Sequence, residues 1–124
     1  MIMCTSPEEL ERAKGLKKNY SFFKIAFGWF PSDAKEVGDK EIQYLIDQTS
    51  YLDCLGEIGL DYYWDTSFND LQKNYLSNKF KLRMNTIFRF PFIMRESTKD
   101  CMDILKQYAK TKSYFIVLVE VKKQ

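Results

Sequence analysis

The sequence of 124 residues contains no histidine. A chain without imidazole lacks the commonest protein ligand of metal ions and the commonest general base near neutral pH. Any metal ion bound by its side chains must therefore be held by carboxylates, carbonyls or thiolates. This absence excludes sites built on several histidines and directs attention to Asp and Glu.

Cysteine is also scarce. Cys4, Cys54 and Cys101 are odd in number and far apart in the sequence. This spacing provides neither a disulfide framework nor a zinc knuckle. We therefore expect three reduced thiols in or near the core.

Long apolar runs are absent as well. No run approaches the roughly 18 residues that a membrane span needs, and the first residues have neither a positively charged region nor a signal-like apolar stretch. Hydrophobic residues make up 45% of the chain and charged residues 29%, as in folded globular proteins. We therefore expect a cytoplasmic protein without a membrane partner, folded as one domain over residues 1–124.

Apolar strand patterns alternate with amphipathic helical patterns along the chain. The expected strands lie at 2–4, 22–27, 54–58, 90–94 and 114–119. Helices are expected to begin after the N-cap Ser6, at Asp39, at Thr66 or Ser67, and at Ser97 or Thr98. Their expected apolar faces are Leu10, Ala13 and Leu16; Ile42, Leu45 and Ile46; Leu71, Tyr75 and Leu82; and Cys101, Ile104, Leu105 and Tyr108.

This alternation predicts an α/β fold built from parallel β-α units. Two architectures agree with it, a small doubly wound sheet and part of a barrel. A complete eightfold barrel is excluded because it typically takes about 250 residues.

The sharpest local feature is the segment 56–65, which reads GEIGLDYYWD. Glu57 and Asp61 bracket the end of an expected strand, where ligands bind in parallel α/β folds. Carboxylates at that place are suitable ligands for a hard metal ion. The alternative is that none of these carboxylates binds a ligand: Glu57 caps the next turn, and Asp61 and Asp65 are solvated loop residues.

A second feature is the basic and aromatic segment 71–95, which contains no Asp or Glu. Its cations are Lys73, Lys79, Lys81, Arg83, Arg89 and Arg95, and its interleaved aromatic residues are Tyr75, Phe80, Phe88, Phe90 and Phe92. Positive charge beside rings that can stack is typical of nucleic-acid binding. The alternative is a solvated basic helix face whose aromatic residues belong to the core.

The run GEIGLDYY at 56–63 resembles the GEIGLDYY motif of the TatD family of metal-dependent deoxyribonucleases. Segment 28–34, GWFPSDA, resembles the GIHP-(H/S)DA turn of that family, and Gln72 stands where the family's next helix carries a glutamine. Arg95-Glu96-Ser97 and the residues up to 105 resemble the stretch after the family's IHSRE motif. The resemblance runs from about residue 5 to 108.

The resemblance implies a partial (β/α)8 barrel of the TIM type, with four to five parallel strands and outer helices. It also implies hydrolysis of DNA phosphodiesters with a site for two divalent metal ions. Glu57 would be a metal ligand, and Asp61 and Arg95 would be substrate-binding residues. Arg95 would lie at the barrel mouth, where a guanidinium can hold a phosphate with two hydrogen bonds.

The sequence departs from the family at most of its ligand positions. The HxH ligands of the first strand would lie before Met1, and the last aspartate ligand would lie beyond Gln124. Phe30 stands where the GIHP histidine is expected, and Ile93 stands where the IHSRE histidine is expected. Residues 115–121 have no counterpart of the later HCFSG motif.

These departures leave no residue to which a catalytic role can be assigned, and Glu57 is the one remaining metal ligand. We therefore expect a truncated or inactive hydrolase fragment in which the divalent ion binds weakly or not at all. The alternative is a non-catalytic scaffold or nucleic-acid-binding domain. A partial barrel also leaves open sheet edges, from which we expect self-association.

Overall fold

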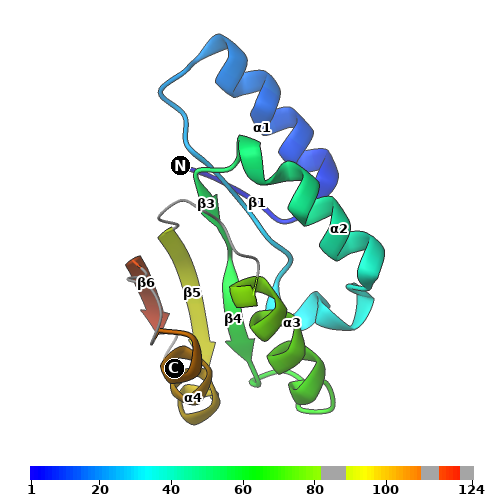
Figure 1. Ribbon diagram of the computed structural model, residues 1–124, viewed down its shortest axis with the longest axis vertical. Helices are drawn as coiled ribbons and strands as arrows, with labels where there is room; N and C mark the ends of the chain where they lie inside the picture. Colours follow the sequence, from blue (N-terminus) through cyan, green and yellow to red (C-terminus); the bar gives the residue numbers. More distant parts are fainter. Residues whose placement is uncertain (82–88, 110–114, 121–124) are drawn as a thin grey trace.

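Strands and helices alternate along the chain (Figure 1). The computed structural model describes residues 1–81, 89–109 and 115–120. Its strands are β1 (Ile2–Cys4), β2 (Ile25–Phe27), β3 (Cys54–Leu55), β4 (Ile58–Asp61), β5 (Arg89–Arg95) and β6 (Phe115–Glu120). Its helices are α1 (Pro7–Asn19), α2 (Asp39–Gln48), α3 (Asn69–Lys81) and α4 (Thr98–Ala109), with short 3-10 helices η1 (Pro31–Glu36) and η2 (Thr49–Tyr51). Within these ranges, every helix falls short of the length and apolar character that crossing a membrane requires.

All strand pairs in the sheet are parallel. β1 pairs with β2, β2 with β3, and β5 with β6, while β3 and β4 follow one another along the same edge of β5. The strands therefore lie in the order of the sequence, whereas a doubly wound sheet would reverse its order at a switch point. The predicted partial barrel is confirmed.

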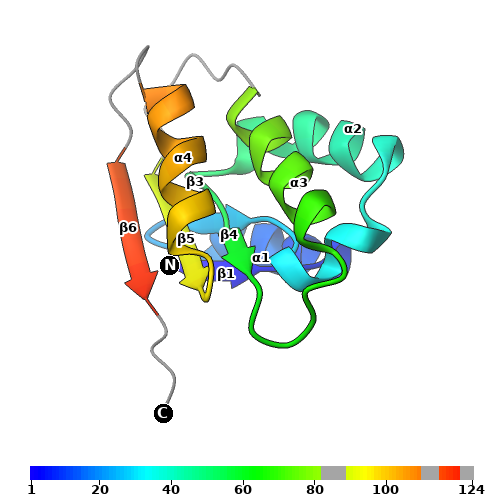
Figure 2. The same cartoon turned by 90° about the horizontal axis from the view of Figure 1, so that it is seen from below.

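The four helices cover one face of this sheet (Figure 2). One hydrophobic cluster joins helix residues to alternate strand residues: Leu10, Ala13, Leu45, Leu76, Cys101 and Ile104 from the helices, and Cys4, Ile25, Phe27, Leu55, Ile58, Leu60, Phe92 and Met94 from the strands. The other face carries Met3, Ala26 and Ile93, because side chains alternate along each strand. Helices on a single side agree with the expected outer layer of a barrel.

The three cysteines are buried and carry free thiols, as the sequence predicts. Burial raises the pKa of the Cys4 and Cys101 thiols, so they remain protonated at neutral pH. They belong to the core and are poor nucleophiles.

The strand expected at 54–58 is interrupted by a bulge. Between the pairs Cys54–Arg89 and Ile58–Phe92, three residues on one strand face two on β5. One extra residue in one strand is a β-bulge, which re-aims nearby side chains. Glu57 therefore lies between β3 and β4, and Asp61 takes the place at the end of the strand.

Some expected boundaries and faces are wrong. Phe22 lies outside β2 and is 73% exposed, because pairing with β1 begins at Ile25. Gly38, not Asp39, precedes the first turn of α2, and the Glu41 carboxylate accepts its N–H at 2.9 Å. α3 begins at residue 69, after a turn in which Asp65 accepts the Ser67 N–H.

Two expected core leucines are exposed. Leu71 precedes Gln72, which faces the sheet, so its side chain points about 100° away around α3. Leu16 lies near the end of α1, where the helix passes the edge of the packed core.

At Gly59 the strands β4 and β5 are too close together to leave room for a side chain. Its φ is +142°, and a Cβ built on it would lie 1.9 Å from the Ile93 carbonyl oxygen. We expect Gly59→Ala to lower the free energy of unfolding by about 3 kcal/mol, through backbone strain and displacement of β5. Gly15→Ala is the matched control, because its Cβ meets nothing within 4 Å in the middle of α1. We expect Gly15→Ala to raise the free energy of unfolding by about 0.5–1 kcal/mol. Equal urea midpoints for the two variants would contradict this account.

Candidate functional site

The carboxyl ends of β4 and β5 bring Asp61 and Arg95 together. The two residues are paired in the strand register, and an Arg95 guanidinium nitrogen lies 3.7 Å from Asp61 Oδ2. Their side chains are 14% and 24% exposed, respectively. The arrowheads of β4 and β5 end at the same edge of the sheet in Figure 1. The structure thus makes neighbours of the two residues to which the sequence assigns substrate binding.

Gln72 of α3 holds the backbone of Asp61 in place. Its side-chain oxygen accepts the Asp61 N–H at 2.8 Å, and its side-chain nitrogen donates to the Asp61 carbonyl at 2.8 Å. Gln72 is only 2% exposed, so the pair is shielded from water. The amide thus satisfies both polar groups at a strand end, as a neighbouring strand would. The sequence identifies the position of Gln72 by resemblance but not this role.

Two further contacts join the end of β4 to the segment after β5. Ser97 Oγ donates to the Leu60 carbonyl at 2.8 Å, and the Tyr62 N–H donates to the Arg95 carbonyl at 3.0 Å. The sequence predicts Ser97 or Thr98 as the helix cap; Ser97 directly precedes α4, and its hydroxyl bonds to β4. Both contacts fix the position of Arg95 along the strand direction relative to Asp61.

The hydroxyl of Tyr62 donates to Asp100 Oδ2 at 2.8 Å, and Lys73 lies 3.6 Å from the same oxygen. Burial, together with the Asp100 carboxylate, raises the pKa of Tyr62. Tyr62 therefore stays neutral and acts as a structural donor from β4 to α4.

The Arg95 guanidinium lies between a carboxylate and an aromatic ring. Its central carbon is 5.5 Å from the centre of the Tyr63 ring, within the range of a cation–π contact. A 3.7 Å separation from Asp61 is an ion pair but is too long for a hydrogen bond. Its buried Nε has no hydrogen-bond partner among the described residues. Because the contact with Asp61 is too long for a hydrogen bond, the terminal guanidinium nitrogens keep donors with which they could bind an anion.

Glu57 lies in the bulge and is partly buried. Phe30 follows β2 and is 39% exposed, and Ile93 on β5 is paired with Gly59. These two apolar residues occupy the positions that the resemblance assigns to histidine ligands. Among residues 1–81, 89–109 and 115–120, no three Cys, Asp or Glu side chains lie close enough together to hold a metal ion. The side chains present do not fit a site for two metal ions.

The residues of the basic and aromatic segment 71–95 have different roles. Lys73 pairs with Asp70 at 3.1 Å and with Asp100 at 3.6 Å. Tyr75 and Phe92 are core residues with 5% and 0% exposure, so neither can stack on a base. Apart from Arg95, described above, the remaining members lie outside the residues whose side chains the structure describes: Lys79, Phe80, Lys81, Arg83, Phe88, Arg89 and Phe90. For Tyr75 and Phe92 the core interpretation is correct.

Replacing Gln72 tests how much the end of β4 depends on it. Gln72→Leu leaves the N–H and carbonyl of Asp61 without partners, and we expect a loss of about 2 kcal/mol in unfolding free energy. Gln72→Glu keeps the acceptor but removes the donor and buries an ionisable carboxyl group against the Asp61 carbonyl, so a loss at least as large as that of Gln72→Leu is expected. The exposed Gln43 of α2 supplies the control Gln43→Leu, for which we expect a change within about 0.5 kcal/mol. Urea unfolding followed by circular dichroism measures all three, and equal midpoints for the two leucine variants would contradict the role given to Gln72.

Comparisons with known proteins agree with this architecture. The sequence profile of a family described as TatD related DNase matches residues 1–118. The chain is 30% identical over 100 residues to the uncharacterized metal-dependent hydrolase YabD of Bacillus subtilis. It is 25% identical over 116 residues to the uncharacterized metal-dependent hydrolase MG009 of Mycoplasma genitalium. The crystal structure of YJJV, a TatD homolog from Escherichia coli K12, superposes on 86% of the chain with a TM-score of 0.70 and 22% identity, which supports the fold.

The chain is much shorter than these proteins. The matched region covers 79% of this chain but 39% of YabD, and 89% of this chain but 44% of MG009. It covers 43% of the YJJV chain. The chain therefore spans about two fifths of the length of the relatives it matches.

Proposed function

Because the chain belongs to the TatD-related DNase family, we propose that its function is part of a metal-dependent hydrolysis of DNA phosphodiesters. In this proposal Glu57 contributes a metal ligand, and Asp61 and Arg95 contribute to phosphate binding. The 124 residues alone do not turn over DNA. The family's divalent metal ion is expected to bind this chain weakly or not at all.

The observation that carries the proposal is the Asp61–Arg95 pair at the carboxyl ends of adjacent parallel strands. Active sites of (β/α)8 barrels lie at this end of the strands. A guanidinium there matches the geometry of a phosphate, and Asp61 orients it without consuming its donors. Backbone contacts from Gln72 and Ser97 keep the pair in position, as preorganised binding requires.

The reason for proposing an inactive chain is the composition of the ligand positions. Hydrolysis of this type needs a metal ion to activate water and to neutralise charge that develops on the phosphate. Phe30 and Ile93 offer no electron pair to a metal, and Glu57 supplies one carboxylate. A single carboxylate cannot fix the geometry of two ions.

A second candidate function is binding of nucleic acid without catalysis. The same observation favours it, because Arg95 can hold a phosphate whether or not a metal is present. In either case the proposed partner is DNA, residues 1–124 act as one domain, and the setting is cytoplasmic. Among the described strands, the free edge of β1 offers a place for self-association, which stays a prediction.

The direct test is an activity measurement on the pure chain. With magnesium or manganese and labelled single- or double-stranded DNA, we expect no cleavage products on a denaturing gel. Glu57→Ala should give the same result, because no assembled site is lost. Metal-dependent cleavage that Glu57→Ala abolishes would show that this chain holds a working site, and the proposal of inactivity would be wrong.

Restoring imidazoles tests whether Glu57 occupies a ligand position. We expect the double variant Phe30→His/Ile93→His to bind cobalt or zinc, because two imidazoles and one carboxylate form a common ligand set. Removing Glu57 from that variant should lower the affinity by about 10-fold or more. The control variant is Phe30→His/Ile46→His. It keeps the histidine at position 30 and moves the second histidine to α2. Equal calorimetric affinities for the variant and its control would show that position 93 adds no ligand, and equal affinities with and without Glu57 would remove Glu57 from the metal site.

A further inference from the structure

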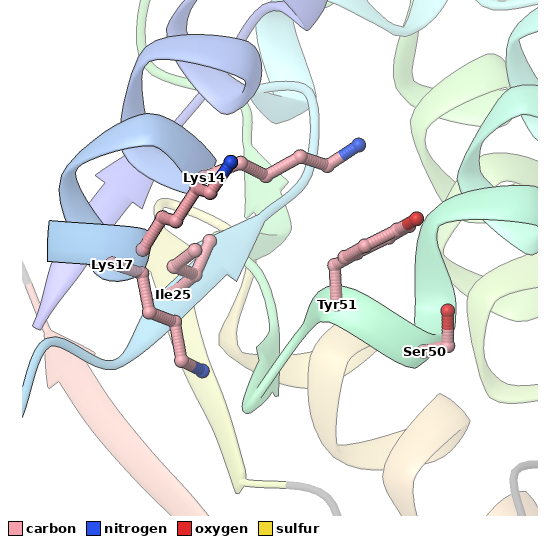
Figure 3. Close-up of a pocket in the computed structure, with 6 residues that line it drawn as sticks. Lys14, Lys17, Ile25, Ser50 and Tyr51 are labelled. Atoms are coloured by element: carbon pink, nitrogen blue, oxygen red, sulfur yellow. The ribbon is translucent and has the colours of Figure 1, made fainter. Parts of the chain in front are cut away.

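A pocket of about 440 Å³ lies at the opposite end of the sheet from Asp61 and Arg95. Its walls come from α1, β2 and η2 (Figure 3), and it is lined by Lys14, Lys17, Lys18, Ile25, Ser50 and Tyr51. We call it the lysine pocket. Ile25 is the first residue of β2, so the lysine pocket belongs to the amino-terminal end of the strands. It is therefore separate from the site described above.

Fixed ion pairs shape one wall of the lysine pocket. Lys17 lies 2.7 Å from Asp53 and Lys24 lies 3.6 Å from the same carboxylate, which also accepts the Ile25 N–H at 2.9 Å. Burial alone would raise the pKa of Asp53, but the bonds from Lys17 and Ile25 and the charges of Lys17 and Lys24 outweigh it and lower the pKa. Asp53 therefore stays ionised and fixes these groups in place.

The lysine pocket keeps a positive excess after these pairs are counted. Lys14 pairs with Glu11 at 2.9 Å, and its ammonium lies 4.0 Å from the centre of the Tyr51 ring. Lys18 makes no ion pair within the described part of the chain and is exposed. Lys14 pairs with Glu11, Lys17 and Lys24 share Asp53, and Lys18 has no ion pair among the described residues, so four lysines in and beside the lysine pocket are matched by two carboxylates. Charge complementarity therefore calls for an anionic ligand.

Three aromatic rings lie on the loop that joins two walls of the lysine pocket. We call this loop, residues 20–24, the aromatic loop. Tyr20 is 53% exposed and Phe22 is 73% exposed, and the Phe22 and Phe23 ring centres are 4.6 Å apart. Exposed rings grouped in this way are unusual on a protein surface unless they bind something. Tyr51, 53% exposed, adds a ring inside the lysine pocket.

We propose that the lysine pocket and the aromatic loop together bind single-stranded DNA. Lysines beside exposed rings match a chain that alternates phosphates with flat bases, because each base can stack on a ring and each phosphate can pair with an ammonium. Bases within a duplex are already stacked, so their faces are not available to Phe22 and Tyr20. A pocket of this volume is of ordinary size for a small ligand and can take one nucleotide of the strand.

The surface itself is independent of the proposed catalytic site. Only the choice of DNA over RNA rests on the proposed function. The experiment separates the two by comparing equally exposed rings at opposite ends of the sheet: Phe22 at 73% on the aromatic loop and Trp64 at 75% beyond β4. Both variants remove a ring that is largely outside the core, so circular dichroism should show an unchanged fold.

The measurement is fluorescence anisotropy of a labelled oligo-dT of about 12 nucleotides, a length on the scale of single-strand binding sites. We expect Phe22→Ala to weaken binding roughly 5- to 100-fold, as the loss of one base–ring stack does. Phe22→Trp should retain affinity, and Trp64→Ala should change it less than Phe22→Ala.

Lys18→Ala should reduce the slope of log affinity against log salt by about 0.7, the loss of one phosphate contact in a single strand. Lys40→Ala on α2 is its control and should leave the slope unchanged.

Four results would overturn the proposal. The first is the absence of binding to the wild-type chain. The second is a loss confined to Trp64→Ala, which would place DNA at the carboxyl end of the strands and leave the proposed function standing. The third is equal or tighter binding of duplex DNA, of an RNA of the same length, or of a single mononucleotide. The fourth is an unchanged salt slope in Lys18→Ala.

Discussion

The parallel contact between β4 and β5 is the constraint on which the candidate site depends. It requires Gly59, because any Cβ there would meet the Ile93 carbonyl. With the strands this close, Asp61 falls opposite Arg95, and the Leu60 carbonyl comes within reach of Ser97. A glycine that allows close packing therefore determines which charged residues become neighbours. The ion pair is a consequence of the strand register and not its cause, since the two residues are opposite each other in the register and their 3.7 Å separation is too long for a hydrogen bond.

The sequence predicts those parts of the fold whose causes are local. Ser6 accepts the Glu9 N–H and Pro7 opens α1, as their order in the chain indicates. The parallel alternation follows from the apolar patterns, and the resemblance selects the barrel over the doubly wound sheet. The identities of Asp61 and Arg95 as strand-end residues also come from the sequence, although their mutual distance does not.

The sequence does not predict features that arise between distant segments. The bulge between β3 and β4 exists only relative to β5, and no pattern within 54–61 marks it. Gln72 would be placed on a solvated face by its polarity, yet it is buried because Asp61 supplies both hydrogen-bond partners. Phe22 has the composition of a strand residue, but pairing with β1 begins three residues later. In each case tertiary contacts override the local preference.

Most residues of the GEIGLDYY run serve packing more than chemistry. Gly59 permits strand contact, Leu60 is a core residue, and Tyr62 is tied to Asp100. Only the carboxylates of Glu57 and Asp61 have chemistry to offer a ligand. A chain can therefore keep this run for the sake of its fold when Phe30 and Ile93 stand where the resemblance expects histidine ligands. A match to the run is strong evidence for the scaffold, while catalysis has to be judged from the residues at the positions that the resemblance assigns to metal ligands, of which positions 30 and 93 carry apolar side chains.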